Sequence, residues 1–200
     1  MLCFKKTALI AAFVPVFYFF SVRAGAQGWD LNLAKSINPQ NPGSSFWKGA
    51  TSSVYPVAIA IPFGQLAVGL IGHDKLTLHR AYETFGSILV STAISQVLKS
   101  SINRQRPGEK HPDEIFPYKQ EHGKSFPSGH TTLAFAAATS LALEYKKWYV
   151  VVPAYIWAGC AGYSRIYLGE HYPSDVIGGA VTGAGSALLS HWLTKKLLKR

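Results

Sequence analysis

The apolar residues of this chain gather into long runs with few or no charges. Six such runs cover residues 7–22, 54–72, 85–98, 131–143, 148–163 and 176–193. A helix rises about 1.5 Å per residue, so the runs 54–72 and 176–193 are long enough to span the roughly 30 Å of a hydrocarbon core. The three runs between them are shorter, but most come close to this length if their helices extend into the flanking residues. The pattern predicts an all-α fold, a helical bundle with about five to six transmembrane helices.

The positions of the basic residues favour a membrane protein. Lys and Arg fall at the ends of apolar runs, and the stretches 75–80, 146–147 and 195–200 become short basic cytoplasmic segments if the first run starts in the cytoplasm. The mean hydropathy of +0.11 is low for a polytopic protein, so a soluble helical bundle stays open as an alternative. Gly179 and Gly183 have the spacing that lets two helices pack closely in lipid.

The length and the N-terminal run set the domain organisation. The 200 residues suffice for one domain with a full core and contain no linker-like stretch. Residues 1–26 combine a basic start, an uncharged run and a small-residue segment, which fits either a cleaved signal peptide or a first transmembrane helix. Residues 27–200 then form a single domain. Cys3 and Cys160 lie far apart in apolar stretches, so no disulfide is expected.

The net charge of +10 raises the question of nucleic-acid binding. The Lys and Arg residues are not gathered on one amphipathic face, however, so we expect no nucleic-acid partner. The histidines outside the clusters described below match no metal-ligand spacing, and no metal or cofactor is predicted.

Three short clusters of charged residues and histidines carry the candidate chemistry. In the first, Lys99 precedes Arg106-Pro107 by seven residues. A helix running through both cations would place them on one face, about two turns apart, and Pro107 would end it. Two such cations repel each other unless an anion lies between them, although a solvated basic helix end gives the same pattern.

The second cluster, Pro127-Ser128-Gly129-His130, lies at the predicted start of a helix. The backbone N–H groups of a first helical turn have no intrahelical acceptor and, together with the helix dipole, bind anions. Gly129 lets a ligand approach the backbone closely, whereas Ser128 either caps the helix or contacts the ligand. The imidazole of His130 can exchange a proton with a bound leaving group.

The third cluster contains Ser164-Arg165, His171 and Asp175. Pro173 predicts the start of the last helix, so the carboxylate of Asp175 can reach one imidazole nitrogen of His171 and leave the other free to attack phosphorus. A His and an Asp near a helix start also occur as a structural cap pair. The guanidinium of Arg165 suits two-point contact with phosphoryl oxygens.

Together the clusters resemble the three-part signature of the type 2 phosphatidic acid phosphatase and vanadium haloperoxidase superfamily. The signature reads Lys-x6-Arg-Pro, Pro-Ser-Gly-His and Ser-Arg-x5-His-x3-Asp, which here are residues 99–107, 127–130 and 164–175. The resemblance covers about residues 82–193. It implies a metal-independent phosphatase in which His171 forms a phosphohistidine, Asp175 orients it and His130 protonates the leaving group. It also implies phosphate binding by Lys99, Arg106, Ser128, Gly129 and Arg165.

The resemblance implies a membrane lipid phosphatase whose partners are the bilayer and a lipid phosphate monoester or diphosphate. Family members of this size act on phosphatidic acid, phosphatidylglycerol phosphate, undecaprenyl diphosphate or lipid A. We expect the bacterial inner membrane, with the active site facing the periplasm and the loop 108–125 over the pocket. A soluble periplasmic acid phosphatase of broad specificity is the alternative, followed by a haloperoxidase that holds vanadate in the phosphate pocket.

Overall fold

The computed structural model describes residues 25–197, and these residues form helices and connecting loops without strands. The helices, in chain order, are α2 (Gly25–Ile37), α3 (Ser45–Ser52), α4 (Val54–Ile71), α5 (Lys75–Ile102), α6 (Pro107–Lys110), α7 (Gly129–Tyr145), α8 (Trp148–Tyr167) and α9 (Pro173–Leu197). The prediction of an all-α bundle is confirmed. Residues 1–24 lie outside the described part, and so does almost all of the segment predicted as a signal peptide or first transmembrane helix.

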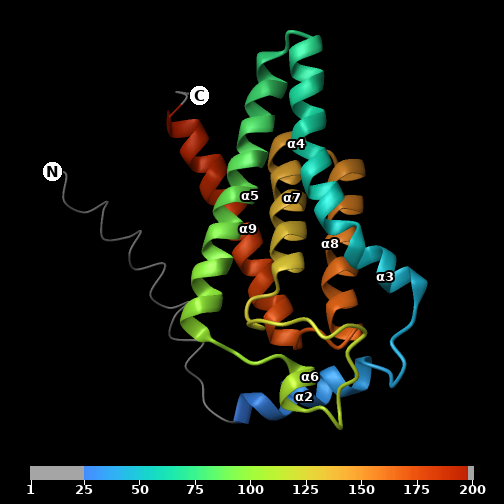
Figure 1. Cartoon of the computed structure of the whole chain (residues 1–200). Helices are drawn as coiled ribbons and strands as arrows, with labels where there is room; N and C mark the ends of the chain where they lie inside the picture. Colours follow the sequence, from blue (N-terminus) through green and yellow to red (C-terminus); the bar gives the residue numbers. More distant parts are fainter. Residues whose placement is uncertain (1–24, 198–200) are drawn as a thin grey trace, which may run out of the picture.

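Helix α7 lies at the centre of the bundle. It packs against α4, α5, α8 and α9, and α4 and α5 form a long antiparallel hairpin beside it (Figure 1). The short helices α2 and α6 lie across the lower end of the bundle in this view, together with the loop that leads into α7. The turns between α4 and α5 and between α7 and α8 lie at the opposite end.

The contact between α7 and α9 depends on two glycines. A Cβ added at Gly183 would lie 2.2 Å from the carbonyl oxygen of Thr132, and one at Gly179 would lie 2.7 Å from that of Ser128. Any side chain would therefore push the helices apart, which confirms the close packing predicted from the glycine spacing. This contact brings the first turn of α9 to the start of α7, where the backbone N–H of Ser128 donates to the carbonyl of Asp175 at 3.0 Å.

The distribution of side chains is that of a bundle surrounded by lipid. Small residues such as Ser87, Ser91, Ala134, Ala138 and Ala161 fill the interior. Large apolar side chains point outward along the helices, among them Ile59, Phe63, Leu89, Val97, Ile156, Val181 and Leu188. Within the described residues, three stretches are long and apolar enough to cross a membrane: Val54–Ile71, Lys75–Lys110, which includes α5, and Pro173–Lys196. Lipid-facing apolar surface and small residues at helix contacts are typical of membrane bundles.

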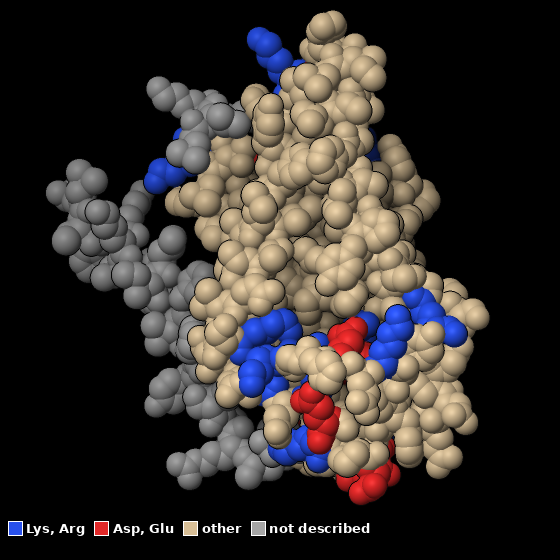
Figure 2. Space-filling model, in the orientation of Figure 1, with Lys and Arg blue, Asp and Glu red and all other residues tan. Residues whose placement is uncertain are grey.

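Charged side chains are concentrated at the ends of the bundle. Figure 2 shows an uncharged belt over the middle of the helices and basic and acidic residues gathered at the end where α2 and α6 lie. The basic stretches predicted to be cytoplasmic, beginning at Lys75 and at Lys146, follow the turns at the other end (Figure 1). The two ends are therefore distinct, and the candidate chemistry lies at only one of them.

Candidate active site

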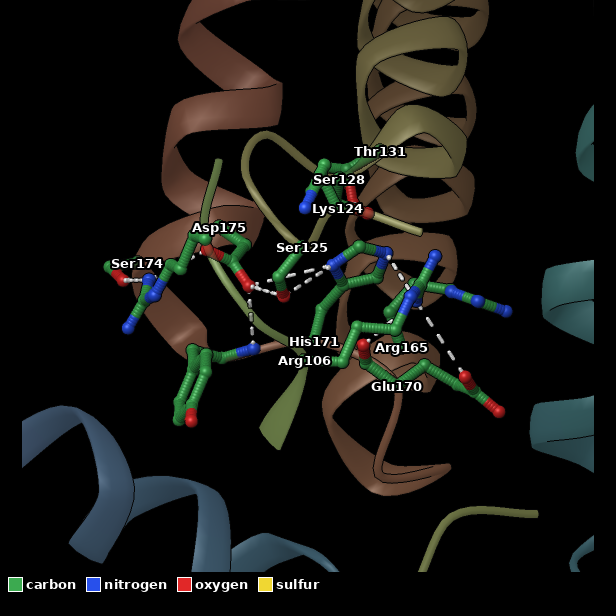
Figure 3. Close-up of polar contacts among 12 residues, drawn as sticks. Arg106, Lys124, Ser125, Ser128, Thr131, Arg165, Glu170, His171, Ser174 and Asp175 are labelled. Carbon is green, nitrogen blue, oxygen red and sulfur yellow. Dashed lines mark hydrogen bonds and ion pairs between the residues drawn. The ribbon is translucent and has the colours of Figure 1, made fainter. Parts of the chain in front are cut away.

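The candidate nucleophile, His171, lies in the turn between α8 and α9, at the end of the bundle covered by α2 and α6. Its side chain is only 2% exposed. Its Nδ1 lies 3.5 Å from Oδ2 of Asp175, in the first turn of α9, and its Nε2 lies 3.4 Å from Nη1 of Arg106 (Figure 3). One imidazole nitrogen thus faces a carboxylate and the other faces a cation.

The carboxylate of Asp175 is fully buried and has four polar neighbours. Oδ2 accepts hydrogen bonds from the Ser125 hydroxyl and from the backbone N–H of Tyr172, at 2.5 and 3.0 Å. Oδ1 accepts one from Nη1 of Arg104 at 2.6 Å. These contacts fix the rotation of the carboxylate, so its orientation toward His171 is set by several groups together.

The start of α7 contributes the Ser-Gly-His segment. Ser128 is the N-cap residue, but its side chain makes no capping hydrogen bond; its Oγ accepts from the Thr131 hydroxyl at 2.9 Å. Around Gly129, no atom lies within 4 Å of an added Cβ, so the backbone there is open to a ligand. The ring of His130 packs edge-on against Tyr55 on α4, with 4.9 Å between centroids.

Two arginines lie beside the histidines, and a single carboxylate bridges them. Oε2 of Glu121 lies 3.1 Å from Nη2 of Arg106, and its Oε1 accepts from Nη2 of Arg165 at 2.8 Å. Nη1 of Arg165 donates to the Thr51 hydroxyl at 2.8 Å. The Nε atoms of both arginines are buried and have no hydrogen-bond partner among the described residues. Each arginine therefore has an N–H left to donate to a bound anion.

The predicted helix through Lys99 and Arg106 is wrong. Helix α5 ends at Ile102, because Asn103 adopts a left-handed conformation with φ 52°. Arg106 has an extended backbone, and Pro107 begins the short helix α6 instead of ending α5. Lys99, still on α5, donates from Nζ to the carbonyl of Lys124 at 2.7 Å. The two cations therefore reach the same end of the bundle by different routes.

Burial controls the protonation of the groups in the loops of the site. It lowers the pKa of His171 to about 4, although the hydrogen bond and charge of Asp175 act in the opposite direction. The imidazole is therefore neutral at pH 7, as a nucleophile requires. Burial also raises the pKa of Glu170 to about 7. For Glu121, burial favours the neutral form, but the charge and hydrogen bond of Arg165 and the charge of Arg106 together outweigh it, and the pKa is lowered.

Several residues at the site did not stand out in the sequence. Ser125 and Arg104 bind Asp175, Glu121 bridges the arginines, and Asp30 on α2 binds Arg104. Arg104 and Ser125 each lie two residues from a signature position, which was the only available signal for them. No sequence signal pointed to Asp30, because the residues before the resemblance predict only an early helix and a connecting segment.

The family model described as "PAP2 superfamily" matches residues 81–199. The chain belongs to the PAP2 superfamily. It is 35% identical over 111 residues to a lipid A 1-phosphatase of Rhizobium johnstonii, which covers 53% of this chain and 44% of that protein. The chain thus spans less than half the length of that relative.

Two solved structures share the fold of this PAP2 chain. The crystal structure of Aquifex aeolicus LpxE superposes with a TM-score of 0.66 at 28% identity, over 81% of this chain and 94% of that one. A transmembrane PAP2-type phosphatidylglycerolphosphate phosphatase from Bacillus subtilis gives a TM-score of 0.66 at 24% identity, over 96% of this chain and 97% of that one. The family, the helical architecture and the membrane character predicted from the sequence are therefore confirmed.

Proposed function

We propose that this PAP2 protein is a membrane phosphatase that hydrolyses a lipid phosphate monoester or diphosphate without a metal ion. The observation that carries the proposal is the buried His171–Asp175 pair, with its free imidazole nitrogen facing Arg106 at 3.4 Å. The unpartnered Nε atoms of Arg106 and Arg165 support an anion at this place, because buried N–H groups are rarely left without an acceptor.

In the first step, Nε2 of His171 attacks phosphorus, so that an N–P bond forms while the P–O bond to the lipid breaks. The positive charge that develops on the imidazole is stabilised by Asp175 at Nδ1. The proton for the leaving oxygen comes from His130, which lines the same cavity as Arg165. Burial and the charge of Arg165 lower the pKa of His130 to about 3, so the imidazole takes up this proton only with the negative charge of the substrate phosphate beside it.

The charge on the transferring phosphoryl group is spread over fixed donors. Arg106, Arg165, Lys99 and the backbone N–H of Gly129 take this role, which Mg²⁺ fills in many other phosphoryl-transfer enzymes. The Ser128 hydroxyl accepts from Thr131, which leaves its own hydrogen for a phosphoryl oxygen. In the second step, water deprotonated by His130 attacks the phosphohistidine, and inorganic phosphate leaves.

The proposed location is the bacterial inner membrane, with the site facing the periplasm. The apolar belt around the helices supports a membrane over a soluble periplasmic protein (Figure 2). The basic stretches at Lys75 and Lys146 lie at the end opposite to the site, and basic segments favour the cytoplasmic side. Lipid A is the first substrate to test, because the Rhizobium johnstonii relative is a lipid A 1-phosphatase.

The test is phosphate release by the purified protein in detergent with EDTA present, across lipid A, undecaprenyl diphosphate, phosphatidylglycerol phosphate and phosphatidic acid. We expect release from at least one of these lipids. His171→Ala should abolish release, and His73→Asn, which removes an imidazole at the far end of the bundle, should not affect it. His130→Ala should slow release and accumulate an acid-labile protein-bound phosphate. No release by the parent from any lipid, or equal release by His171→Ala, contradicts the proposal.

A further inference from the structure

Two residues that are not among the specified positions of the three-part signature form an ion pair close to the candidate nucleophile. Nη2 of Arg104 donates to Oδ2 of Asp30 at 2.6 Å, and Asp30 is only 2% exposed. Arg104 follows the end of α5, whereas Asp30 lies on α2, outside the range 81–199 that the family model matches. The pair therefore joins a helix that is not part of the family match to the catalytic end of the bundle.

Asp30 and Arg104 both bind the first turn of α9. Oδ1 of Asp30 accepts from the backbone N–H of Ser174 at 2.9 Å, and its Oδ2 accepts from the Ser174 hydroxyl at 2.5 Å. Such N–H groups of a first helical turn need an acceptor, and here the side chain of another helix supplies it. Nη1 of Arg104 donates to the same hydroxyl and to Oδ1 of Asp175, each at 2.6 Å.

The contact with Arg104 is the one that holds Oδ1 of Asp175, and it acts together with the contacts of Ser125 and Tyr172 at Oδ2 to decide which carboxylate oxygen faces the nucleophile. Arg104 donates to Oδ1. The other oxygen, Oδ2, lies 3.5 Å from Nδ1 of His171 (Figure 3). The guanidinium is itself held in place, because its Cζ lies 4.0 Å above the centroid of the Tyr172 ring and Asp30 takes its other nitrogen. Without such partners, a carboxylate rotates about its terminal bond in a broad, two-fold well.

Asp30 is needed because Arg104 has an alternative environment. The Arg104 side chain is 25% exposed and lines an open cavity of about 630 Å³ together with Lys110, Lys124 and Tyr172. Without the Asp30 carboxylate, the guanidinium loses one of its two carboxylate partners and is free to turn toward the water of this cavity. Asp30 thus affects Asp175 indirectly, by holding Arg104 in place.

We propose that Asp30, acting through Arg104, is a positioning residue that keeps Asp175 oriented toward His171, so that α2 belongs to the catalytic machinery. The inference rests on the phosphatase function proposed above. Among the described residues, no hydrogen bond or ion pair joins Asp30 or the Arg104 side chain to Arg106, Arg165 or His130, so substitution of either leaves the phosphate-binding groups in place. Their effect therefore falls on the rate of the chemical step and not on the binding of the phosphoryl group.

The test compares kcat, KM and inhibition by inorganic phosphate for four variants of the full chain, after each has been shown to be folded in detergent. Asp30→Asn keeps the size of the side chain, and we expect a fall in kcat of tenfold or more, with KM and the phosphate inhibition constant within about twofold of the parent values. Arg104→Gln should lose at least as much. Arg104→Lys, which retains the charge and one donor, should recover part of that loss. Lys110→Gln, which removes a charge from the same cavity without a contact to Asp175, should match the parent.

The double variant Asp30→Asn, Arg104→Gln tests whether Asp30 acts through the arginine. We expect it to be within about threefold of Arg104→Gln alone, because the second change removes an interaction that is already lost. If the losses multiply, or if the kcat of Asp30→Asn lies within twofold of the parent, the inference is wrong. It is also wrong if KM and the phosphate inhibition constant rise in proportion to the fall in kcat, since that indicates general damage to the site. If Arg104→Gln does not fold, Asp30→Asn alone decides. A parent that releases no phosphate contradicts the proposed function itself.

Discussion

Substitution of Glu121 by Gln should strengthen the binding of inorganic phosphate. The carboxylate of Glu121 lies 3.1 Å from Arg106 and 2.8 Å from Arg165, so it holds N–H groups that a phosphoryl group needs. Burial acts to raise its pKa, but the two arginines together outweigh burial and the pKa is lowered, so the carboxylate is charged throughout the neutral range. A bound phosphate must displace this charge or lie beside it, and both cost binding free energy.

The size of the effect follows from the exposure of the partners. The Glu121 side chain is 33% exposed, and the guanidiniums are 10% and 3% exposed. Partly exposed ion pairs contribute about 0.2–1 kcal/mol each, so two of them give about 0.4–2 kcal/mol. At 1.4 kcal/mol per tenfold change, the inhibition constant of phosphate should fall by about 2- to 25-fold.

The assay is competitive inhibition of lipid phosphate hydrolysis by inorganic phosphate at pH 7 and constant ionic strength. The control is Glu109→Gln, which removes the same charge from an exposed position in the cavity that Glu121 also lines. An inhibition constant for Glu121→Gln that equals or exceeds the parent value would refute the reasoning. It would mean that the carboxylate organises the two arginines for phosphate and does not compete with it.

The long helices were predictable from the sequence because the apolar runs are the dominant signal there. The run 54–72 coincides with α4, and the run 148–163 lies within α8. Helices α2 and α3 were missed, since short helices with mixed polar and apolar residues resemble a connecting segment. Asp30 was missed for the same reason, and its contact with Ser174 spans 144 residues. Local patterns contain no information on contacts of that range.

The break after α5 shows why residue spacing alone misplaced Arg106. Neither Gly nor Pro lies between Lys99 and Arg106, so the sequence offered no strong helix stop. The helix ends at Ile102 because the next residue is Asn103, one of the few residues other than Gly that adopt the left-handed conformation at low cost. The signature still located the cations, because it records which residues meet in space and not how the chain connects them. The loop residues Glu121 and Ser125 have no periodic pattern around them, and only the folded structure places them.

Three further changes test other parts of the structure. The acid limb of the pH profile of kcat/KM should lie near pH 4, where Nε2 of His171 takes up a proton and can no longer attack phosphorus. An acid limb near pH 6.5 would contradict this. Ser125→Ala removes a buried hydrogen bond to Asp175. It should lower kcat by about tenfold, the equivalent of about 1.4 kcal/mol, and leave KM unchanged. A parallel rise in KM would show that Ser125 contributes to substrate binding instead of orienting Asp175. Gly183→Ala should lower the melting temperature in detergent, because its Cβ would lie 2.2 Å from a carbonyl oxygen of α7 and overpacking costs about 1–3 kcal/mol. Gly185→Ala makes the same chemical change two residues later, where no atom lies within 4 Å of the added Cβ, and it should leave the melting temperature unchanged or slightly raised. Equal melting temperatures for the two variants would show that α9 can move away from α7 at little cost, and the close contact that brings Asp175 to the start of α7 would then not depend on glycine.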